Sequence, residues 1–216
     1  MIPKLHYISQ GATPKTHIEN IQKACQSGAE LVQLRLKHYS EKKILKAAQE
    51  AREITSHYQT RLIINDHYKI AKEVKADGVH LGKSDTCPSI ARKALYSWQI
   101  VGGTANTLED CENLINKKVD YIGLGPFRFT ETKDNLSPVL GLKGYEGIIE
   151  TLKTETPIIA IGGLTTDDIP ELLTTGIHGI AVSREITKNF NNINVFKQLL
   201  KSSEDLEEQV WKPKNS

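Results

Sequence analysis

The sequence predicts an α/β fold, a single (β/α)8 TIM barrel with parallel strands. Three observations support this prediction. Eight short apolar runs of strand type recur along the chain, a helical pattern follows each of them, and the eight units fit within about 200 residues. A doubly wound open sheet is the main alternative. The barrel is favoured by the number of units and by Gly162-Gly163 after the seventh run, because phosphate sites recur after strands seven and eight.

The predicted strands are short apolar or alternating runs bounded by turn residues. They cover residues 5–9, 31–37, 61–64, 78–82, 99–101, 121–124, 157–161 and 179–182. The fifth strand ends in residues 102–106, which begin with two glycines. Gly123 and Gly125 do not form a dinucleotide-binding fingerprint, because Pro126 follows them and no helix opens there.

Residues that typically start or end helices lie between these strands and predict a helix in each interval. Pro14 opens the first helical pattern and Gly28 ends it. Ser40 is placed as the N-cap of the second helix, with Glu41 in its first turn. Later helices are expected up to residue 74, from about 88, from about 108, at 144–153, after the acidic start 165–168, and around 195–200.

The charge balance argues against a broad surface for nucleic acid or membrane. The chain has 28 basic and 26 acidic residues, a net charge of +2, and no long run of one sign. A broad surface for nucleic acid or membrane is therefore not expected, although a local basic site is compatible with this balance. Assembly into a homo-oligomer is also compatible with the sequence.

Cysteine usage and the ends of the chain predict a cytoplasmic protein. Cys25, Cys87 and Cys111 are an odd, widely spaced set without a C-x-x-C pair, which argues against a disulfide framework or structural zinc. No signal peptide and no apolar run of transmembrane length is evident. We expect a catalytic barrel domain over residues 1–200 and a charged C-terminal tail over residues 201–216.

The stretch 121–133, YIGLGPFRFTETK, predicts a strand followed by an anion-binding loop. Proline lacks a backbone donor, so the strand must stop near Pro126. The loop beyond it carries Thr130, Thr132 and Lys133. Two hydroxyls and one ammonium suit the oxygens of a phosphate or diphosphate. An ordinary solvated loop is the alternative for this stretch taken alone.

Residues that follow the strands of a barrel meet on one face. The polar residues at these positions are Arg35, Lys37, Asn65, Asp66, Asp85, Thr104, Thr130, Thr132, Lys133, Gly163 and Ser183. Three cations, two carboxylates and several hydroxyls on one rim predict a site for a diphosphate with Mg²⁺. Asp66 and Asp85 are the candidate metal ligands, because Mg²⁺ takes one or two carboxylates together with phosphate oxygens.

Each of these residues also has a structural alternative. Asp66 and Asp85 could be helix N-caps, a common role for aspartate between a strand and a helix. Arg35 and Lys37 could pair with acidic neighbours in the barrel mouth, and Gly162-Gly163 could permit a tight turn. His80 is expected to be a packed strand residue, because no histidines fall at metal-ligand spacing. The functional prediction depends on the joint placement of these residues.

The chain resembles the thiamine-phosphate synthase family from about residue 5 to residue 187. The motifs that carry the resemblance are Gln33-x-Arg35-x-Lys37, Asn65-Asp66, Gly78-Val79-His80-x-Gly82-x-x-Asp85, Gly125-Pro126 with Thr130-x-Thr132-Lys133, and Gly162-Gly163. This set in this order is highly specific. The family is a (β/α)8 barrel that joins 4-amino-2-methyl-5-(diphosphomethyl)pyrimidine to a thiazole phosphate, with Mg²⁺, and releases diphosphate.

The resemblance implies a role for each matching position. Residues 33–37, which include Gln33, Arg35 and Lys37, would hold the pyrimidine diphosphate together with Asn65 and Thr104, and Asp66 and Asp85 would hold Mg²⁺. Lys133 would contact the diphosphate. The thiazole phosphate would be bound by Thr130, Thr132, Gly163, Ser183 and Arg184. Arg35, Lys37, Thr104 and Lys133 would be the catalytic residues, and no nucleophilic side chain would be required.

Several positions depart from the family pattern. Thr104 replaces the usual serine, Leu36 a frequent glutamate, Lys83 a common glutamine and Asn106 a common histidine. The usual Val-Ser pair after strand eight aligns with Ser183-Arg184, so the hydroxyl comes one residue early. None of these changes affects the carboxylate pair or Lys133.

Two other functions are alternatives to synthesis of thiamine phosphate. A thiazole tautomerase, the isomerase that the family resembles, should not need both Asp66 and Asp85 or the complete Thr-x-Thr-Lys loop. A non-catalytic binder of thiamine precursors is expected to lose Lys133 or a metal ligand, and here none is lost.

Overall fold

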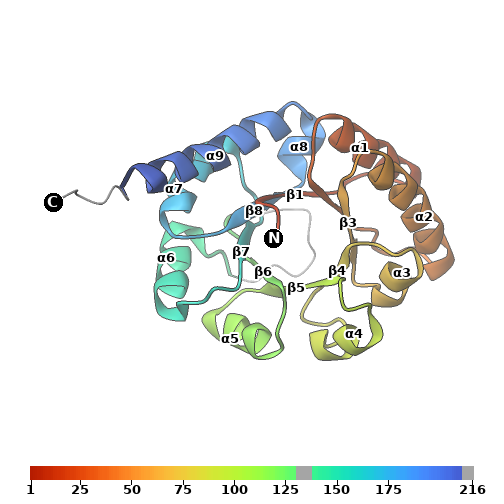
Figure 1. The fold of residues 1–216 in the computed structure, drawn as a ribbon, viewed down its shortest axis with the longest axis horizontal. Helices are drawn as coiled ribbons and strands as arrows, with labels where there is room; N and C mark the ends of the chain where they lie inside the picture. Colours follow the sequence, from red (N-terminus) through yellow and green to blue (C-terminus); the bar gives the residue numbers. More distant parts are fainter. Residues whose placement is uncertain (130–137, 211–216) are drawn as a thin grey trace.

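The computed structural model describes residues 1–129 and 138–210, and for residues 202–210 the backbone alone. It confirms the predicted fold: a closed barrel in which every strand is parallel to its neighbours and β8 pairs with β1 (Figure 1). The strands are β1 (Leu5–Ile8), β2 (Leu31–Leu34), β3 (Arg61–Asn65), β4 (Gly78–Leu81), β5 (Ile100–Ala105), β6 (Tyr121–Leu124), β7 (Ile158–Ile161) and β8 (Gly179–Val182).

Helices surround the barrel, and their positions follow the predicted order (Figure 1). They are α1 (Pro14–Gln26), α2 (Glu41–His57), α3 (Tyr68–Glu73), α4 (Pro88–Ala94), α5 (Leu108–Asn116), α6 (Gly141–Leu152), the 3-10 helix η1 (Thr166–Asp168), α7 (Ile169–Thr174), α8 (Arg184–Lys188) and α9 (Asn192–Val210). The backbone of α9 continues ten residues past position 200, so the first part of the charged segment is helical. The division into domain and tail stays a prediction.

Residues that the sequence marked as helix starts stand at the N-termini of several of these helices. Pro14 stands at the first position of α1, and the side chain of Thr13 before it accepts the N–H of Thr16. Thr165 and Asp168 form a capping box at η1, as the acidic stretch suggested. Ser40 occupies the N-cap position of α2, but its side chain makes no capping hydrogen bond.

Strand β5 is longer than predicted because its glycines serve packing. Gly102 and Gly103 stand beyond the predicted strand 99–101, yet both lie within β5. A Cβ on Gly102 would lie 2.2 Å from Cζ of Tyr121, and one on Gly103 would lie 2.6 Å from a methyl carbon of Leu114. Gly102 therefore makes room for the Tyr121 side chain of β6, and Gly103 makes room for the Leu114 side chain of α5.

Strand β2 is shorter than predicted. It ends at Leu34 instead of continuing to Lys37, and His38 adopts a left-handed backbone with φ of 63°. The N–H of Arg35 donates to the hydroxyl of Ser9, at 3.1 Å, instead of to a backbone carbonyl of β1. Residues 35–37 are thus released from the ladder at the rim of the barrel.

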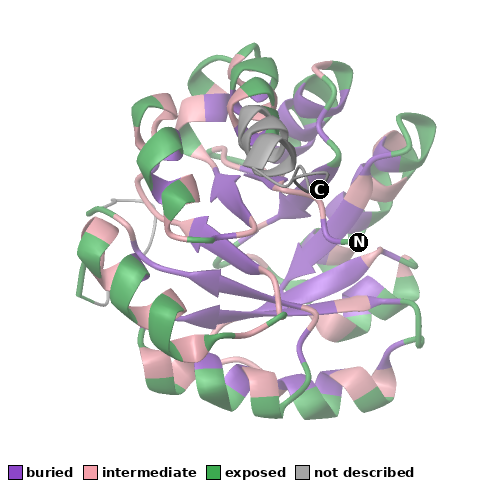
Figure 2. Ribbon diagram, turned by 60° about the vertical axis from the view of Figure 1, so that its left-hand side comes forward, coloured by how far each residue is buried: buried purple, intermediate pink, exposed green. Residues whose placement is uncertain are grey.

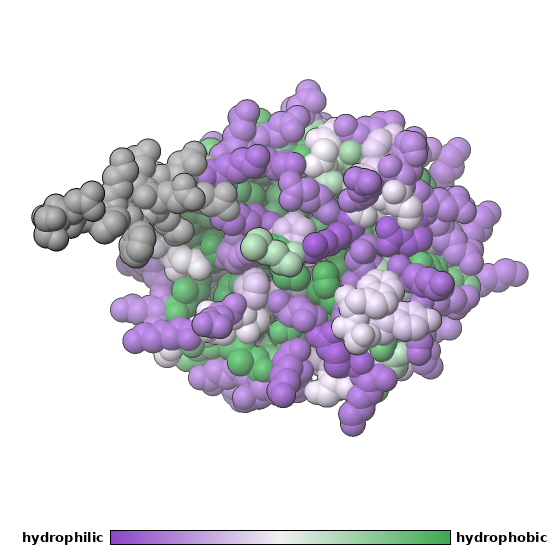
Figure 3. All heavy atoms as spheres, viewed as in Figure 1, coloured by the Kyte–Doolittle hydropathy of each residue, from purple (hydrophilic) through white to green (hydrophobic). Residues whose placement is uncertain are grey.

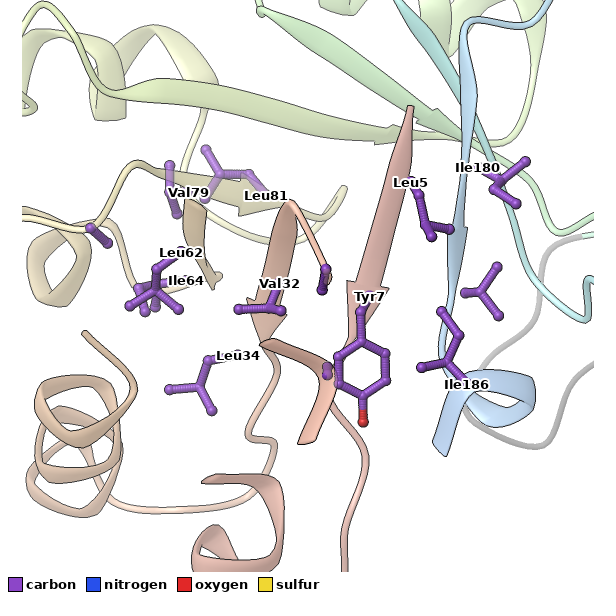
Figure 4. Close-up of a cluster of buried hydrophobic side chains, with 14 of the residues drawn as sticks. Leu5, Tyr7, Val32, Leu34, Leu62, Ile64, Val79, Leu81, Ile180 and Ile186 are labelled. Atoms are coloured by element: carbon purple, nitrogen blue, oxygen red, sulfur yellow. The ribbon is translucent and has the colours of Figure 1, made fainter. Parts of the chain in front are cut away.

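Two layers of apolar side chains stabilise the barrel. The outer layer lies between strands and helices, where alternate residues such as Leu5 and Tyr7 or Leu62 and Ile64 point outward (Figure 4). The inner layer includes Tyr121 and Ile159. Figure 2 shows the buried strands at the centre and exposed residues on the outer faces of the helices. Burial of this kind contributes about 25 cal/mol per Å² of apolar area.

The N-terminal end of the barrel is held by two equivalent ion pairs. Asp77 accepts the N–H of Leu62, at 2.8 Å, and Nη1 of Arg52, at 2.7 Å. Asp120 accepts the N–H of Val101, at 2.7 Å, and Nη2 of Arg92, at 2.5 Å. Each aspartate joins a helix to the start of a strand. This end therefore serves stability, and the loops of the opposite end are available for chemistry.

The molecular surface is largely polar in the view of Figure 3, where hydrophilic residues surround smaller hydrophobic areas. In the part of the chain that the structure describes, no helix is both long and apolar enough to cross a membrane.

Candidate active site

The described site residues lie at the C-terminal ends of the strands, as predicted. Because the strands are parallel and form one closed barrel, these ends share a rim. The residues at or just after a strand end are Gln33, Arg35, Lys37, Asn65, Asp66, Asp85, Thr104, Gly163, Ser183 and Arg184. Thr130, Thr132 and Lys133 lie outside the described residues, so their roles stay predictions.

Lys37, Asp66 and Asp85 form the charged centre of this rim. The ammonium of Lys37 donates to Oδ2 of Asp66, which confirms for Lys37 the pairing with an acidic neighbour. Burial and the adjacent Asp85 raise the pKa of Asp66, and Lys37 opposes this shift. Burial acts in the same direction on Asp85, but hydrogen bonds with Asp66 and the N–H of Gly82 lower its pKa overall. Two carboxyl groups therefore share a small, partly buried volume.

Neither carboxylate caps a helix. The N-cap of α3 is His67 and that of α4 is Cys87, and neither helix start has a side-chain capping hydrogen bond. Oδ2 of Asp85 instead accepts the N–H of Gly82, at 2.7 Å, within the β4–α4 loop. A Cβ on Gly82 would lie 2.9 Å from that oxygen, so glycine permits the approach. Asp66 has a left-handed backbone, with φ of 64°. The helix-cap alternative for both aspartates is therefore wrong.

These residues fit a hard divalent cation. Asp66 and Asp85 come from adjacent strands and offer oxygen ligands side by side. Among the described residues, no group of three or more His, Cys, Asp or Glu is arranged to hold a metal ion. A two-carboxylate set suits Mg²⁺, which completes its coordination with water and substrate phosphate oxygens.

Asn65 adds an unsatisfied donor to the same rim. It is the last residue of β3 and 7% exposed, and within the described residues its Nδ2 has no hydrogen-bond partner. A buried amide without a partner costs about 1–3 kcal/mol, so the group needs an explanation. A substrate acceptor is the explanation that agrees with its predicted role.

Below Thr104 lies a buried polar chain that sequence reasoning missed. His80 is buried as expected, but both ring nitrogens have partners: Nε2 contacts Oγ1 of Thr104, at 2.8 Å, and Nδ1 contacts the hydroxyl of Tyr121, at 3.0 Å. The ring of His80 also stacks on that of Tyr121. This chain fixes the Thr104 side chain from beneath. The feature of the sequence that could have indicated these hydrogen bonds is a histidine at an inward-facing position of the strand, between Gly78 and Gly82.

The glycine pair after β7 has a backbone that requires glycine. Gly162 and Gly163 have φ of 93° and 73°, and a Cβ on Gly162 would lie 2.7 Å from Cβ of Pro126. The carbonyl of Gly163 accepts Nη1 of Arg128, at 3.0 Å. Among the described residues, the N–H of Gly163 donates to no acceptor. In the part of the chain that the structure describes, a tight turn and a main-chain N–H without an acceptor thus coexist at this position.

Arg128 anchors this region and was not identified from the sequence. Its guanidinium makes a two-point contact with Asp168, at 2.7 and 3.0 Å. Although burial opposes the shift, the hydrogen bonds from Arg128 and Thr165 lower the pKa of Asp168. The N–H of Arg128 also donates to the carbonyl of Gly162. The chain that leaves β6 is therefore attached to the β7 loop.

Tyr145 separates the ends of β6 and β7. Its side chain is buried, and its hydroxyl donates to the carbonyl of Leu124 and accepts the N–H of Ile161, at 3.3 Å. In the register that pairs Leu124 with Ala160, these two backbone groups would otherwise form the next ladder bond. One hydroxyl thus replaces a direct bond between the strands at the rim.

The remaining predicted residues and departures have ordinary contacts. Ser183 Oγ lies 3.5 Å from Oε1 of Gln10, and its carbonyl accepts the N–H of Thr187. Lys83 pairs with Asp110 at 2.5 Å. Asn106 is buried and its Nδ2 donates to the carbonyl of Gly125, at the end of β6. The unusual residues at 83 and 106 therefore support the loops around the site.

Two cavities lie away from this rim, at the N-terminal end of the barrel, and both are lined by Pro157 and His178. Neither is lined by a predicted site residue. We assign the site to the opposite rim, because the charged and unsatisfied groups are there and shape alone does not supply chemistry.

Comparisons with known proteins agree with this geometry. The family described as thiamine monophosphate synthase matches residues 5–186. The thiamine-phosphate synthase of Flavobacterium johnsoniae is 46% identical over 202 residues, which cover 92% of this chain and 95% of the relative. That of Bacteroides thetaiotaomicron is 41% identical over 85% of this chain and 90% of the relative.

A solved structure supports the same assignment. The thiamine phosphate pyrophosphorylase from Pyrococcus furiosus superimposes with a TM-score of 0.78 at 27% identity, over 92% of this chain and 96% of that one. The matched segment spans the whole barrel and includes every described rim residue. The chain belongs to the thiamine monophosphate synthase family.

Proposed function

We propose that the protein joins 4-amino-2-methyl-5-(diphosphomethyl)pyrimidine to a thiazole phosphate at this rim, with Mg²⁺, and releases diphosphate. Thiamine-phosphate synthase activity follows from the family, and the proposal assigns its steps to residues of this chain. The observation that carries it is the group formed by Lys37, Asp66 and Asp85 at the ends of adjacent strands.

The pyrimidine diphosphate binds beside β2, β3 and β5. Arg35 and Lys37 supply positive charge, the amide of Asn65 supplies its unsatisfied donor, and Thr104 supplies a hydroxyl held by His80. Gln33 is buried and faces the pyrimidine in this assignment. Asp66 and Asp85 would hold Mg²⁺, which would supply positive charge to the diphosphate oxygens.

The reaction needs stabilised charge and no nucleophilic side chain. The C–O bond to diphosphate breaks and leaves a resonance-stabilised pyrimidinylmethyl cation, which the thiazole nitrogen captures to form the new C–N bond. Arg35, Lys37 and Lys133 stabilise the charge that develops on the departing diphosphate. Both electrons of the broken bond leave with the diphosphate, so the step requires no oxidant and no base.

The thiazole phosphate binds on the β6–β8 side of the rim. In this assignment Thr130 and Thr132 supply hydroxyls, and main-chain donors near Gly163, Ser183 and Arg184 hold the phosphate. The left-handed turn at Gly163, and its N–H, which has no acceptor among the described residues, support the assignment.

The three cysteines support a cytoplasmic setting for the enzyme. Cys25, Cys87 and Cys111 are free thiols. Free thiols persist in a reducing compartment, so we expect the enzyme to work in the cytoplasm. We expect small-molecule substrates and no nucleic-acid or membrane partner.

The direct test is to mix both precursors with Mg²⁺ and the purified protein, and to measure thiamine phosphate and diphosphate. Synthesis that stops when the metal is chelated and resumes with added Mg²⁺ is the expected result. Isomerisation of the thiazole phosphate alone would identify a tautomerase. Binding of both precursors without product would identify a non-catalytic binder.

A further inference from the structure

Ser9, in the loop between β1 and α1, and His17, on α1, form a buried pair that the reaction does not use. Ser9 is 3% exposed and His17 is 7% exposed. Oγ of Ser9 lies 2.8 Å from Nδ1 of His17, and Nε2 of His17 lies 3.0 Å from the carbonyl of Gly11. A Cβ on Gly11 would lie 3.1 Å from Cδ2 of the imidazole, so glycine permits this contact.

The partners determine where the protons are. A carbonyl oxygen can only accept, so the imidazole must carry a proton on Nε2 to bond with Gly11. The N–H of Arg35 donates to Oγ of Ser9, at 3.1 Å. The hydroxyl proton of Ser9 is therefore free to donate to Nδ1. His17 is held neutral with Nδ1 as an acceptor, and burial, together with the charge of Arg35, lowers its pKa.

The hydrogen bonds that run from Gly11 through His17 to Ser9 end at residues 33–35, the segment that carries the proposed diphosphate ligands. The N–H of Ser9 donates to the carbonyl of Gln33, at 2.9 Å, while its hydroxyl accepts the N–H of Arg35. Ser9 thus holds residues 33–35 at two points, one at Gln33 within β2 and one at Arg35 just beyond its last residue. Oγ takes the place that a backbone carbonyl would have if the ladder continued.

The same loop is anchored by a second, independent contact. Nδ2 of Asn20 donates to the carbonyl of Gln10, at 2.7 Å, and Asn20 is 8% exposed. Asn20 lies on α1, as His17 does, and fixes the same loop without a link to Arg35. It is therefore a matched control for the purely structural part of the contribution of His17.

We propose that His17 is a positioning residue for diphosphate binding, which acts through the hydroxyl of Ser9 on the backbone of Arg35. This inference rests on the proposed function, because it takes Arg35 as a diphosphate ligand. Without an acceptor at Nδ1, the Ser9 hydroxyl loses its orientation, and the N–H of Arg35 loses a fixed partner. The backbone of Arg35 is then less firmly held, so its guanidinium is no longer fixed in position at the rim.

The test compares Ser9→Ala, His17→Leu, His17→Asn and the control Asn20→Leu. Binding of inorganic diphosphate in the presence of Mg²⁺ is measured by calorimetry, and KM is measured for each substrate separately. Ser9→Ala and His17→Leu should each weaken diphosphate binding and raise the KM of the pyrimidine diphosphate by about 10-fold, the effect of a lost buried hydrogen bond. The KM of the thiazole phosphate should stay within about twofold in both variants.

Two further results separate positioning from a loss of stability. His17→Asn should restore most of the affinity, because its amide oxygen can accept the proton of Ser9. The double variant Ser9→Ala/His17→Leu should bind diphosphate no more weakly than Ser9→Ala alone, since both changes break one chain of contacts. Asn20→Leu should lower the unfolding midpoint as His17→Leu does, with diphosphate binding close to wild type.

The outcomes distinguish this inference from the proposed function. Wild-type affinity and KM in His17→Leu, with normal synthesis by the wild type, would overturn the role of His17 and leave the function intact. Equal losses of affinity in His17→Leu and Asn20→Leu would reduce His17 to an anchor of the loop. A wild-type protein that neither binds diphosphate nor makes product would overturn both.

Discussion

Tyr145→Phe tests how the rim between β6 and β7 is held open. The change removes one oxygen atom and leaves the packed ring in place, so no cavity of methyl size forms. The carbonyl of Leu124 and the N–H of Ile161 both lose their partner. The carbonyl contact is the stronger, because Leu124 is fully buried, while the 3.3 Å contact to Ile161 is weak.

The expected loss can be worked out from these two contacts. An orphaned buried carbonyl costs about 1–3 kcal/mol and a weak neutral hydrogen bond about 0.5–1 kcal/mol. We therefore expect the free energy of unfolding to fall by about 2–3 kcal/mol. For a chain of this size, that loss lowers the thermal midpoint by about 4–12 °C.

The assay is urea unfolding followed by circular dichroism, with Tyr7→Phe as the matched control. Tyr7 is equally buried, but its hydroxyl contacts Thr187 Oγ1, at 2.9 Å, on the flank of the barrel. Tyr7→Phe should cost about 1 kcal/mol. A loss below about 0.5 kcal/mol in Tyr145→Phe would refute the reasoning, because the two strands would then have closed directly on each other.

Three further predictions concern the carboxylates, the lysine of the β6 loop and a buried histidine. Asp66→Ala and Asp85→Ala should each nearly abolish turnover with an unchanged circular dichroism spectrum; near-normal activity of both at saturating Mg²⁺ would remove them as metal ligands. Lys133→Ala should lower kcat and kcat/KM together by about 10²–10³, and Lys133→Arg should recover little; a raised KM with unchanged kcat would make Lys133 a binding residue. His6 has a pKa lowered from 6.5 to about 3, mainly by burial, so the unfolded chain alone takes up this proton as the pH falls below about 6.5. Above that pH, His6 is neutral in both the folded and the unfolded chain, so it causes no loss of stability. The free energy of unfolding should therefore fall by about 2 kcal/mol between about pH 7.5 and pH 5. Urea unfolding of His6→Asn at both pH values should show a smaller fall, and an equal fall would exclude His6 as the cause.

Local patterns in the sequence determined the fold and the composition of the rim. Alternation and apolar runs placed all eight strands, and Pro14 and the acidic stretch at 165–168 marked helix starts. In a parallel barrel the ends of the strands meet, so residues such as Lys37, Asp66 and Asp85 could be brought together before any coordinates were known. These features depend on residues that are close together in the sequence, so they can be recognised from the sequence alone.

The tertiary structure decided how each group is held. The predicted fifth strand, 99–101, stopped before the glycines of β5, because the Tyr121 ring that fills the space beside Gly102 comes from another βα unit. The contact of Ser9 with Arg35 crosses 26 positions, and that of Arg128 with Asp168 crosses 40. Such contacts are chosen by hydrogen-bond geometry and burial in the closed barrel, and no local periodicity encodes them. The sequence therefore determined which groups reach the rim, and the packing of distant segments determined their orientation and protonation.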